Sequence, residues 1–321
     1  MSATAKTLTT AVIGAGYMGG GIAQVLALAG HHVMLADVDQ RTSRTALRRL
    51  IEQAKDFEAR GLMPVGAEKT IRQNLFAANS VEDAVAGSDY ITEAIPELLE
   101  LKLEMLARIS GACRPSAIIA TNTSAISISD LAKGVTNRER FLGVHWMNPA
   151  PFIPGVELVA GEDTAPETTD VVEELIVHAG KMPTRVADTP GFIANRLQFS
   201  LYKEAVQMLE EGVATAAQID AVVTNSFGFR LALFGPIAIG DMAGLDVYRS
   251  AFHSLAKAYG TRFRAPKSLV QTVDEGNIGL KSGHGFLDID AEEAERLVEY
   301  RDHAYARLSQ LRAELGKAPG L

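Results

Sequence analysis

One short stretch near the start of the chain constrains the fold more than any other part of the sequence. Gly14, Gly16 and Gly19 form a G-x-G-x-x-G pattern that follows an apolar run and opens a helical pattern. In a turn from a buried strand into a helix, the first glycine permits the tight bend, the second lets a ligand approach the backbone, and the third lets the helix pack on the strand. The stretch therefore predicts a βαβ unit that binds a pyrophosphate at its helix N-terminus.

A carboxylate lies where such a unit binds a ribose. Asp37 ends the next apolar run, 18 residues after Gly19. A carboxylate at this place accepts hydrogen bonds from the adenosine ribose and repels a 2′-phosphate. The sequence therefore predicts dinucleotide binding, with NAD favoured over NADP. Arg41 and Arg44, on a polar helical segment nearby, are expected to be solvated charges.

Short apolar runs alternate with helical patterns over the first part of the chain, which is typical of parallel βαβ units. We expect a Rossmann-type α/β fold with a doubly wound, mostly parallel sheet. The expected strands are Leu8–Gly14, Val33–Ala36, Tyr90–Ala94, Ala117–Ala120, Phe141–His145, Val156–Val159 and Thr184–Ala187. Helices are expected over Met18–Leu28 and Gln40–Arg60.

The pattern changes after Asp188, where Thr189, Pro190 and Gly191 interrupt it. The remaining sequence has helical patterns, so we expect an NAD-binding domain over residues 1–188 and an all-helical substrate and dimerisation domain over 189–321. The expected helices are Ile193–Glu211, Ala216–Thr224, Ile237–Tyr259 with breaks, and Arg264–Glu275. The tail Ala291–Leu315 predicts an extra helix that packs on the protein's own surface or on a twin subunit.

Composition excludes several other classes of protein. With 321 residues, 47% apolar and 22% charged, the chain suits about two domains with full cores. A net charge of −8 argues against nucleic-acid binding. Cys113 is the single cysteine, and no histidine and carboxylate cluster has metal-ligand spacing, so neither a disulfide nor a metal is expected. Thr7–Gly30 lacks charge, but its glycines argue against a membrane span or a signal peptide, and we expect a cytoplasmic protein.

A second group of residues carries candidate chemistry. His145 ends an apolar run, and in open α/β sheets ligands bind beyond the carboxyl ends of strands. Glu157 is the lone carboxylate inside the apolar run Val156–Val159, where a buried charge is costly unless partnered. Paired with His145, it would fix the imidazole tautomer and raise its basicity, so that the ring could take a proton from an alcohol. The alternative is a packing role for His145; His31 and His32 are expected at the surface.

With these residues in view, the chain resembles the L-3-hydroxyacyl-CoA dehydrogenase superfamily over nearly its whole length. Seven collinear segments carry the resemblance: GAGYMGGGIAQVLALAGHHVMLAD, EAIPELLELK, ATNTSAISI, GVHWMNPAPFIPGVELV, DTPGFIANR, FGPIAIGDMAGLD and GLKSGHGF. The resemblance implies an NAD-dependent enzyme with a small-molecule substrate, a homodimer held through the helical domain, and an active site in the cleft between the domains.

The resemblance also assigns roles to individual residues. It implies His145 as general base with Glu157 as its partner, and Ser124 and Asn195 as hydrogen-bond donors to the reacting oxygen. It further implies that Asn148 and Trp146 line the substrate pocket and that Glu97, Lys102 and Lys281 contact the cofactor. Without the resemblance, Lys102 and Lys281 would be interpreted as surface lysines, and Ser124 as a helix cap.

The substrate is the least constrained property. Pro154 stands where acyl-CoA members usually have a lysine, Ala125 replaces their second serine, and Trp146 adds an aromatic ring. On the helix that offers basic residues to CoA, Lys55 and Arg60 are offset by Glu52, Asp56 and Glu58. These departures favour a compact or aromatic hydroxy or keto compound, as in a side branch that includes a dehydrogenase of a pyridine carboxylate from vitamin B6 breakdown. A 3-hydroxyacyl-CoA stays open as the alternative.

Two further classes also stay open at this point. One is a non-catalytic NAD-binding sensor or structural protein, against which the joint presence of His145, Glu157, Ser124 and Asn195 argues. The other is a reductase of imines or amines, which would not need a His–Glu pair.

Overall fold

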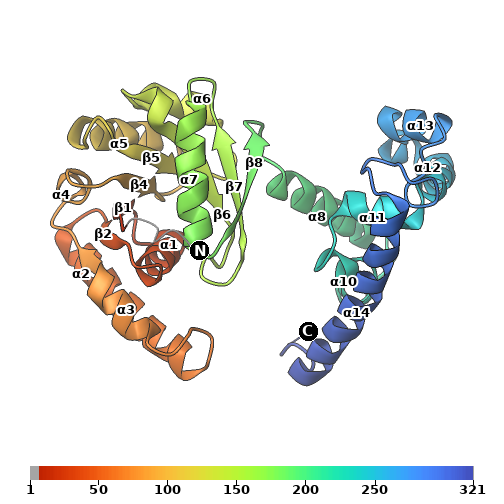
Figure 1. Cartoon of the computed structure of the whole chain (residues 1–321), viewed down its shortest axis with the longest axis horizontal. Coiled ribbons are helices and arrows are strands. Elements are labelled where there is room, and N and C mark those ends of the chain that lie inside the picture. The colour runs from red at the N-terminus through yellow and green to blue at the C-terminus, as the bar shows by residue number, and fades with distance from the viewer. Residues whose placement is uncertain (1–6, 321) are drawn as a thin grey trace. The chain divides into compact units, whose positions relative to one another are not determined.

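The first unit of the chain, which ends at Tyr202, is built on one eight-stranded sheet (Figure 1). The computed structural model describes residues 7–320. The strands are β1 Thr9–Ile13, β2 His32–Ala36, β3 Leu75–Ala77, β4 Tyr90–Glu93, β5 Ile118–Thr121, β6 Phe141–Trp146, β7 Gly155–Ala160 and β8 Met182–Ala187. Their order in the sheet is β3-β2-β1-β4-β5-β6-β7-β8. The strand order reverses between β1 and β4, and such a switch point opens a crevice at the carboxyl ends of the two strands.

Every pair of neighbouring strands is parallel except β6 and β7. Only residues 147–154 separate these two strands, and so short a connection suits an antiparallel pair rather than a parallel crossover. The predicted α/β fold with a mostly parallel, doubly wound sheet is therefore confirmed.

Helices cover both faces of this sheet. They are α1 Tyr17–Leu28, α2 Gln40–Ala59, α3 Ala67–Asn74, α4 Val81–Val85, α5 Leu99–Ala112, α6 Ile128–Leu131 and α7 Pro166–His178, with 3₁₀ turns at Ala132–Gly134 and Arg138–Arg140. α1, α2, α3 and α7 enclose one hydrophobic core against the sheet, and α4, α5 and α6 enclose the other. The strands between them are buried on both faces, which explains their nearly continuous apolar sequence.

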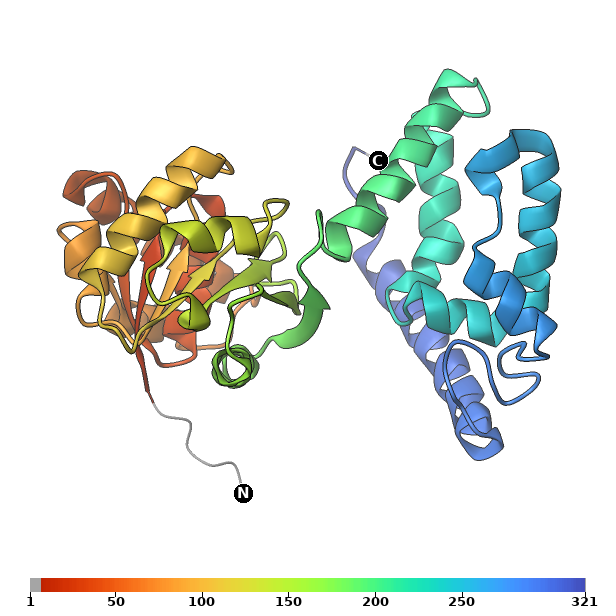
Figure 2. The ribbon, with the colours of Figure 1, turned by 90° about the horizontal axis from the view of Figure 1, so that it is seen from above.

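The second unit begins at Lys203 and consists of helices, as predicted (Figure 2). α8 Ala194–Glu210 contains the division between the units; α9 Ala216–Asn225, α10 Phe227–Leu231, α11 Pro236–Ala243, α12 Leu245–Tyr259, the 3₁₀ turn Gly260–Phe263, α13 Lys267–Asp274 and α14 Ala291–Leu315 come after it. A small core forms around Leu245, Leu269 and Val273. The division of function at residue 188 stays a prediction.

The extra tail helix α14 packs on its own unit. The ring of Tyr305 lies 5.7 Å from that of Phe229 and 5.9 Å from that of Phe234. Arg312 donates a hydrogen bond to the Thr224 carbonyl at 3.0 Å, and its guanidinium lies 5.6 Å from the Phe229 ring centroid. This helix was predicted to pack on the protein's own surface or on a twin subunit, and it packs on the protein's own surface. Among the described helices, none is long and apolar enough to cross a membrane.

His31 is buried, although the sequence placed it at the surface. Its Nδ1 accepts a hydrogen bond from the Leu8 N–H at 3.3 Å, and its ring lies 5.2 Å from that of His178. Burial, and then the nearby His178, lower the pKa of His31 from its usual 6.5. The folded protein therefore favours the neutral ring, whereas the unfolded chain takes up a proton near pH 6.5.

We predict that this linkage makes the folded state pH-sensitive. The stability from a neutral His31 is present above about pH 6.5 and is lost as the pH falls below it. Between pH 7.5 and 5.5, the free energy of unfolding in urea should fall more for the wild type than for His31→Asn, by more than about 0.5 kcal/mol. Equal losses in the two proteins would contradict the prediction.

Candidate active site

The three glycines of the first turn have three different environments. Gly14 has a φ of +101°, and a Cβ there would lie 2.5 Å from the carbonyl oxygen of Ala94, at the end of β4. A Cβ on Gly19 would lie 1.9 Å from the Gly14 oxygen, so α1 packs directly on the turn. A Cβ on Gly16 would have no neighbouring heavy atom within 4 Å, and no side chain caps the helix that starts there. The turn thus offers open backbone at a helix N-terminus, which fits the pyrophosphate of a dinucleotide.

Asp37 follows β2 directly and faces the same turn. Its Oδ2 accepts a hydrogen bond from the Ala15 N–H at 2.6 Å, and its Oδ1 accepts one from the Val38 N–H at 2.7 Å. A carboxylate has about four acceptor sites, so capacity remains for ribose hydroxyls. Asp37 therefore braces the glycine turn and also fits its predicted contact with a ribose.

Lys102 is fully buried in the first unit, at 0% exposure, together with Glu93. Its Nζ lies 2.8 Å from Glu93 Oε1 and 3.4 Å from Glu97 Oε2, and it donates to the Ile95 carbonyl at 3.2 Å. The interpretation of Lys102 as a surface lysine is therefore wrong. A buried ammonium between carboxylates satisfies the rule that buried charges are paired.

Glu97 holds the loop that follows β5. Its Oε1 accepts hydrogen bonds from the Thr123 hydroxyl at 2.6 Å, the Ser124 N–H at 2.7 Å and the Ala125 N–H at 3.0 Å. Burial would raise the pKa of Glu97, but these hydrogen bonds and the Lys102 ammonium outweigh it and lower the pKa. The ionised carboxylate therefore sets the position of Ser124.

His145 and Glu157 face each other across the antiparallel pair β6 and β7, where they are register partners. His145 Nδ1 lies 2.8 Å from Glu157 Oε2, and the residues are 5% and 6% exposed. Glu157 Oε1 accepts hydrogen bonds from the backbone N–H groups of Ile193 at 3.0 Å and Ala194 at 2.9 Å. Burial raises the pKa of Glu157, but the bonds from His145, Ala194 and Ile193 together lower it. Because an ionised carboxylate only accepts, Nδ1 of the ring must be the donor.

The start of α8 connects this pair to the Ser124 loop. Asn195 Nδ2 donates a hydrogen bond to the Ser124 carbonyl at 3.2 Å. Phe192 lies in the left-handed region at φ +47°, uncommon for a residue with a side chain, and its ring centroid lies 5.6 Å from that of His145. A continuous set of contacts therefore joins His145, Glu157, Asn195 and Ser124.

The other predicted site residues have different surroundings. Trp146 is 2% exposed and belongs to the core on the α1 side of the sheet, whereas Phe192 beside His145 belongs to the opposite core. The Trp146 ring therefore does not line a pocket beside His145, as the resemblance implied, because successive strand residues point to opposite faces of the sheet. Asn148 is exposed in the loop after β6. Lys281 belongs to the second unit, where its ammonium pairs with Asp246 at 2.9 Å.

Two contributors to the site were absent from the sequence prediction. Glu93 at the end of β4 pairs with Lys102 and accepts from the Thr121 hydroxyl at 2.6 Å. Asn122, directly after β5, accepts a hydrogen bond from the Trp146 N–H at 2.9 Å. Both are polar residues at the carboxyl ends of neighbouring strands, and this shared position could have identified them.

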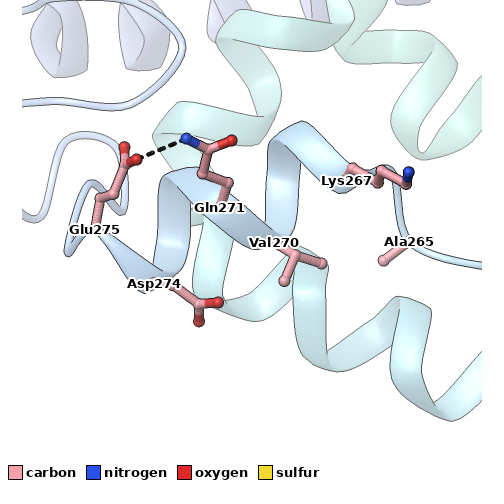
Figure 3. A pocket seen from close by; sticks show the side chains of 6 residues that line it. All are labelled: Ala265, Lys267, Val270, Gln271, Asp274 and Glu275. Carbon is pink, nitrogen blue, oxygen red and sulfur yellow. Dashed lines mark hydrogen bonds between the residues drawn. The ribbon is translucent and has the colours of Figure 1, made fainter.

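Several hollows are lined by residues other than His145, Glu157, Asn195 and Ser124. A cleft of about 290 Å³ between α1, α2 and the turn after β6 is lined by Tyr17, Gln24, Arg49, Phe57, Arg60 and Phe152 among others, with no carboxylate among its lining residues. A groove of about 510 Å³ along α13 contains Lys267, Val270, Asp274 and a Gln271–Glu275 hydrogen bond of 2.8 Å (Figure 3). The α13 groove lacks a general base with an orienting partner. Within residues 7–320, no three His, Cys, Asp or Glu side chains are grouped to hold a metal.

Comparison with known proteins yields a consistent family. The profile of the 3-hydroxyacyl-CoA dehydrogenase NAD binding domain matches residues 9–189, and that of the C-terminal domain matches residues 191–289. A 5-formyl-3-hydroxy-2-methylpyridine 4-carboxylate 5-dehydrogenase of Mesorhizobium japonicum is 34% identical over 91% of this chain and 96% of its own. A 3-hydroxyadipyl-CoA dehydrogenase of Escherichia coli is 38% identical over 88% of this chain and 59% of its own.

Solved structures agree with these relatives. A 3-hydroxyacyl-CoA dehydrogenase of Archaeoglobus fulgidus has a TM-score of 0.77 at 32% identity, covering 96% of this chain and 99% of its own. The structure of a 5-formyl-3-hydroxy-2-methylpyridine 4-carboxylic acid 5-dehydrogenase has a TM-score of 0.72 at 32% identity. The match covers 98% of this chain and 100% of that protein's chain.

We predict that Asp37 selects the cofactor. Asp37→Ala should weaken NAD binding and narrow the gap between the Kd values of NAD and NADP, because it removes both the ribose acceptor and the charge that repels a 2′-phosphate. Fluorescence titration with each dinucleotide measures both values. Asp39→Ala is the matched control, since the Asp39 carboxylate accepts from the Thr42 N–H at the start of α2. A wild type that uses NADP as well as NAD would refute the prediction.

Proposed function

Because the chain belongs to the 3-hydroxyacyl-CoA dehydrogenase family, we propose that its His145–Glu157 pair is the general base of an NAD-dependent oxidation of a hydroxyl group. The observation that carries the proposal is the buried 2.8 Å contact between Nδ1 and Oε2, with the other carboxylate oxygen held by two backbone N–H groups. Whether or not this pair is the general base, the chain is an NAD-dependent oxidoreductase that acts on CH–OH groups.

The pair performs the proton transfer of the reaction. Glu157 accepts the Nδ1 proton, which leaves the Nε2 lone pair of His145 free to take the hydroxyl proton. The imidazolium that forms is stabilised by the Glu157 carboxylate, and in the reverse direction His145 returns the proton. NAD, when bound, supplies the hydride acceptor.

Ser124 and Asn195 are the proposed donors to the reacting oxygen. The Asn195 amide uses one N–H on the Ser124 carbonyl and has a second to offer, and the Ser124 hydroxyl can also donate. Donors already in place where charge develops on oxygen lower the barrier without reorganisation. Glu97, through its bonds to the Ser124 and Ala125 N–H groups, keeps this loop in position.

For the cofactor, we assign the pyrophosphate to the turn of Gly14, Gly16 and Gly19, and the adenosine ribose to Asp37. Glu97 is assigned to the other ribose, with the buried Lys102 as its counter-ion. Lys281 is assigned as a cofactor contact, and Asn148 as a substrate contact. A sensor without catalysis has no use for a buried His–Glu pair, and no observation favours an imine or amine substrate.

We propose a compact hydroxy or keto acid as substrate. At the end of α2, the C-cap residue Arg60 pairs with Asp56 at 3.1 Å, which reduces its attraction for a CoA phosphate. Phe57 of α2 and Phe152 of the turn after β6 pack edge to face, with ring centroids 5.1 Å apart, and narrow the cleft there. Pro154 offers no cation beside this turn. The Mesorhizobium relative, named for a pyridine carboxylate, supports the same class.

A 3-hydroxyacyl-CoA is the second candidate. Arg49 and Arg60 line the same cleft without a carboxylate among the other lining residues, and guanidinium groups suit phosphates. The Escherichia coli relative is named for a CoA thioester.

We also propose a homodimer that forms through the helical unit. This unit has a small core, and many of its apolar side chains are exposed: Leu209, Val213, Val222, Leu231, Ile237 and Val247. Exposed apolar surface on this scale is typical of a protein interface.

We predict that His145→Ala or His145→Gln lowers kcat by about 10² to 10⁴, the usual contribution of a general base, with the Kd for NAD nearly unchanged. Glu157→Gln should lower kcat by a smaller factor, because it removes the carboxylate that orients the His145 ring but leaves the imidazole itself. His32→Gln, a change at an exposed histidine, is the control for steady-state kinetics and NAD titration. An active His145→Ala enzyme would refute the mechanism.

We predict a higher kcat/KM for compact substrates. NADH formation is measured with 3-hydroxybutyryl-CoA, free 3-hydroxybutyrate and an aromatic hydroxymethyl acid. At least one free acid should exceed the thioester by about tenfold or more in kcat/KM, which corresponds to discrimination by about 1.4 kcal/mol. A large advantage for the thioester would instead establish the second candidate.

We predict a dimer in solution at micromolar concentration. Light scattering should give twice the chain mass of 34.3 kDa, because a dimer interface would bury the exposed apolar side chains of the helical unit. A mass equal to one chain would contradict the proposed dimer.

A further inference from the structure

The turn between β6 and β7 has more backbone acceptors than donors. Pro149, Pro151 and Pro154 lack an N–H group, so half of the residues 149–154 cannot donate. The Pro149 carbonyl accepts from Phe152 and Ile153 at 3.0 and 3.1 Å within the turn, and the Pro154 carbonyl accepts from the strand β8. Ala150 is buried, so its carbonyl group needs a partner, and no N–H group of the turn serves it.

Lys181, the residue before β8, supplies the missing donors. Its Nζ donates to the carbonyl oxygens of Ala150 at 2.6 Å, Pro151 at 3.2 Å and Ile153 at 2.8 Å. An ammonium has three N–H groups, and all three are used. Lys181 is 8% exposed, and among the described residues no carboxylate lies within ion-pair distance of it. Burial lowers the pKa of Lys181, whereas hydrogen bonds from an ammonium to carbonyl oxygens favour its charged form.

The turn that Lys181 holds follows the strand that carries His145. It begins four residues after His145 and directly after Asn148. Phe152 contacts Phe57 of α2, and a Cβ on Gly21 of α1 would lie 3.0 Å from Pro151. The turn therefore forms one side of the cleft against α1 and α2, and its shape sets what that cleft accepts.

We propose that Lys181 is a positioning residue for the hydroxy substrate. Its ammonium keeps residues 149–154 in the shape that forms the substrate side of the cleft, and it has no part in NAD binding or proton transfer. The inference rests on the proposed function, which assigns Asn148, the residue directly before this turn, as a substrate contact.

The test is Lys181→Met, which keeps the length of the side chain and removes the three donors. Hydrogen exchange of peptides covering residues 149–156 should become faster, with exchange in α5 unchanged. The KM for the free acid or thioester that the wild type oxidises should rise about tenfold, with the KM for NAD within about twofold. Arg185→Met is the matched control: this β8 cation pairs with the side chains of Asp170 and Glu173 and should alter neither readout.

Several results would overturn the proposal. Unchanged exchange in the turn, or an unchanged substrate KM, would show that the tether does not position the site. Faster exchange throughout the first unit, with both KM values raised alike, would show a general structural role. If Lys181→Met does not fold, Lys181→Gln is put through the same comparison with the same criteria. Failure of the proposed function is distinguishable, because the wild type would then oxidise no substrate while the exchange readout still reports on the tether.

Discussion

The hydrogen bond between His145 and Glu157 depends on the one antiparallel step of the sheet. β6 and β7 run in opposite directions, which makes the two residues register partners and turns both side chains to the same face. Glu157 uses its other oxygen on the N–H groups of Ile193 and Ala194. The same carboxylate therefore orients the ring and fixes the start of α8, which carries Asn195. Removing it would leave backbone donors and a buried ring without partners at once.

Two buried lysines have related tasks in the first unit. Lys102 compensates Glu93 and Glu97, and Glu97 in turn holds the loop of Ser124. Lys181 bonds only to carbonyl oxygens of the turn after β6. A buried charge contributes little net stability, since its desolvation offsets much of its attraction. Its effect here is on shape: each cation determines the conformation of a loop at the carboxyl end of the sheet.

Features with a local cause could be predicted from the sequence. The spacing of Gly14, Gly16 and Gly19 requires a particular turn, and the isolation of Glu157 in an apolar run requires a partner such as His145. The partners of Lys102 and Lys181 could not be predicted. Those of Lys102 depend on how α5 packs beside the end of β4, and those of Lys181 depend on the conformation of the turn after β6, which no local pattern encodes. The orientation of Trp146 could be predicted: because side chains alternate between the two faces along β6, Trp146 must face away from His145. β3 escaped prediction because it has only three residues.

The position of the proton on the His145 ring decides whether Glu157 orients a general base. Nitrogen-15 NMR of histidine-labelled protein distinguishes the two neutral tautomers, and the His145 signals are assigned by their absence from the spectrum of the His145→Gln protein. We expect a proton on Nδ1 and a free lone pair on Nε2, because the Glu157 carboxylate can only accept. A neutral ring with its proton on Nε2 would contradict the account, since that ring could not take a proton from a substrate hydroxyl.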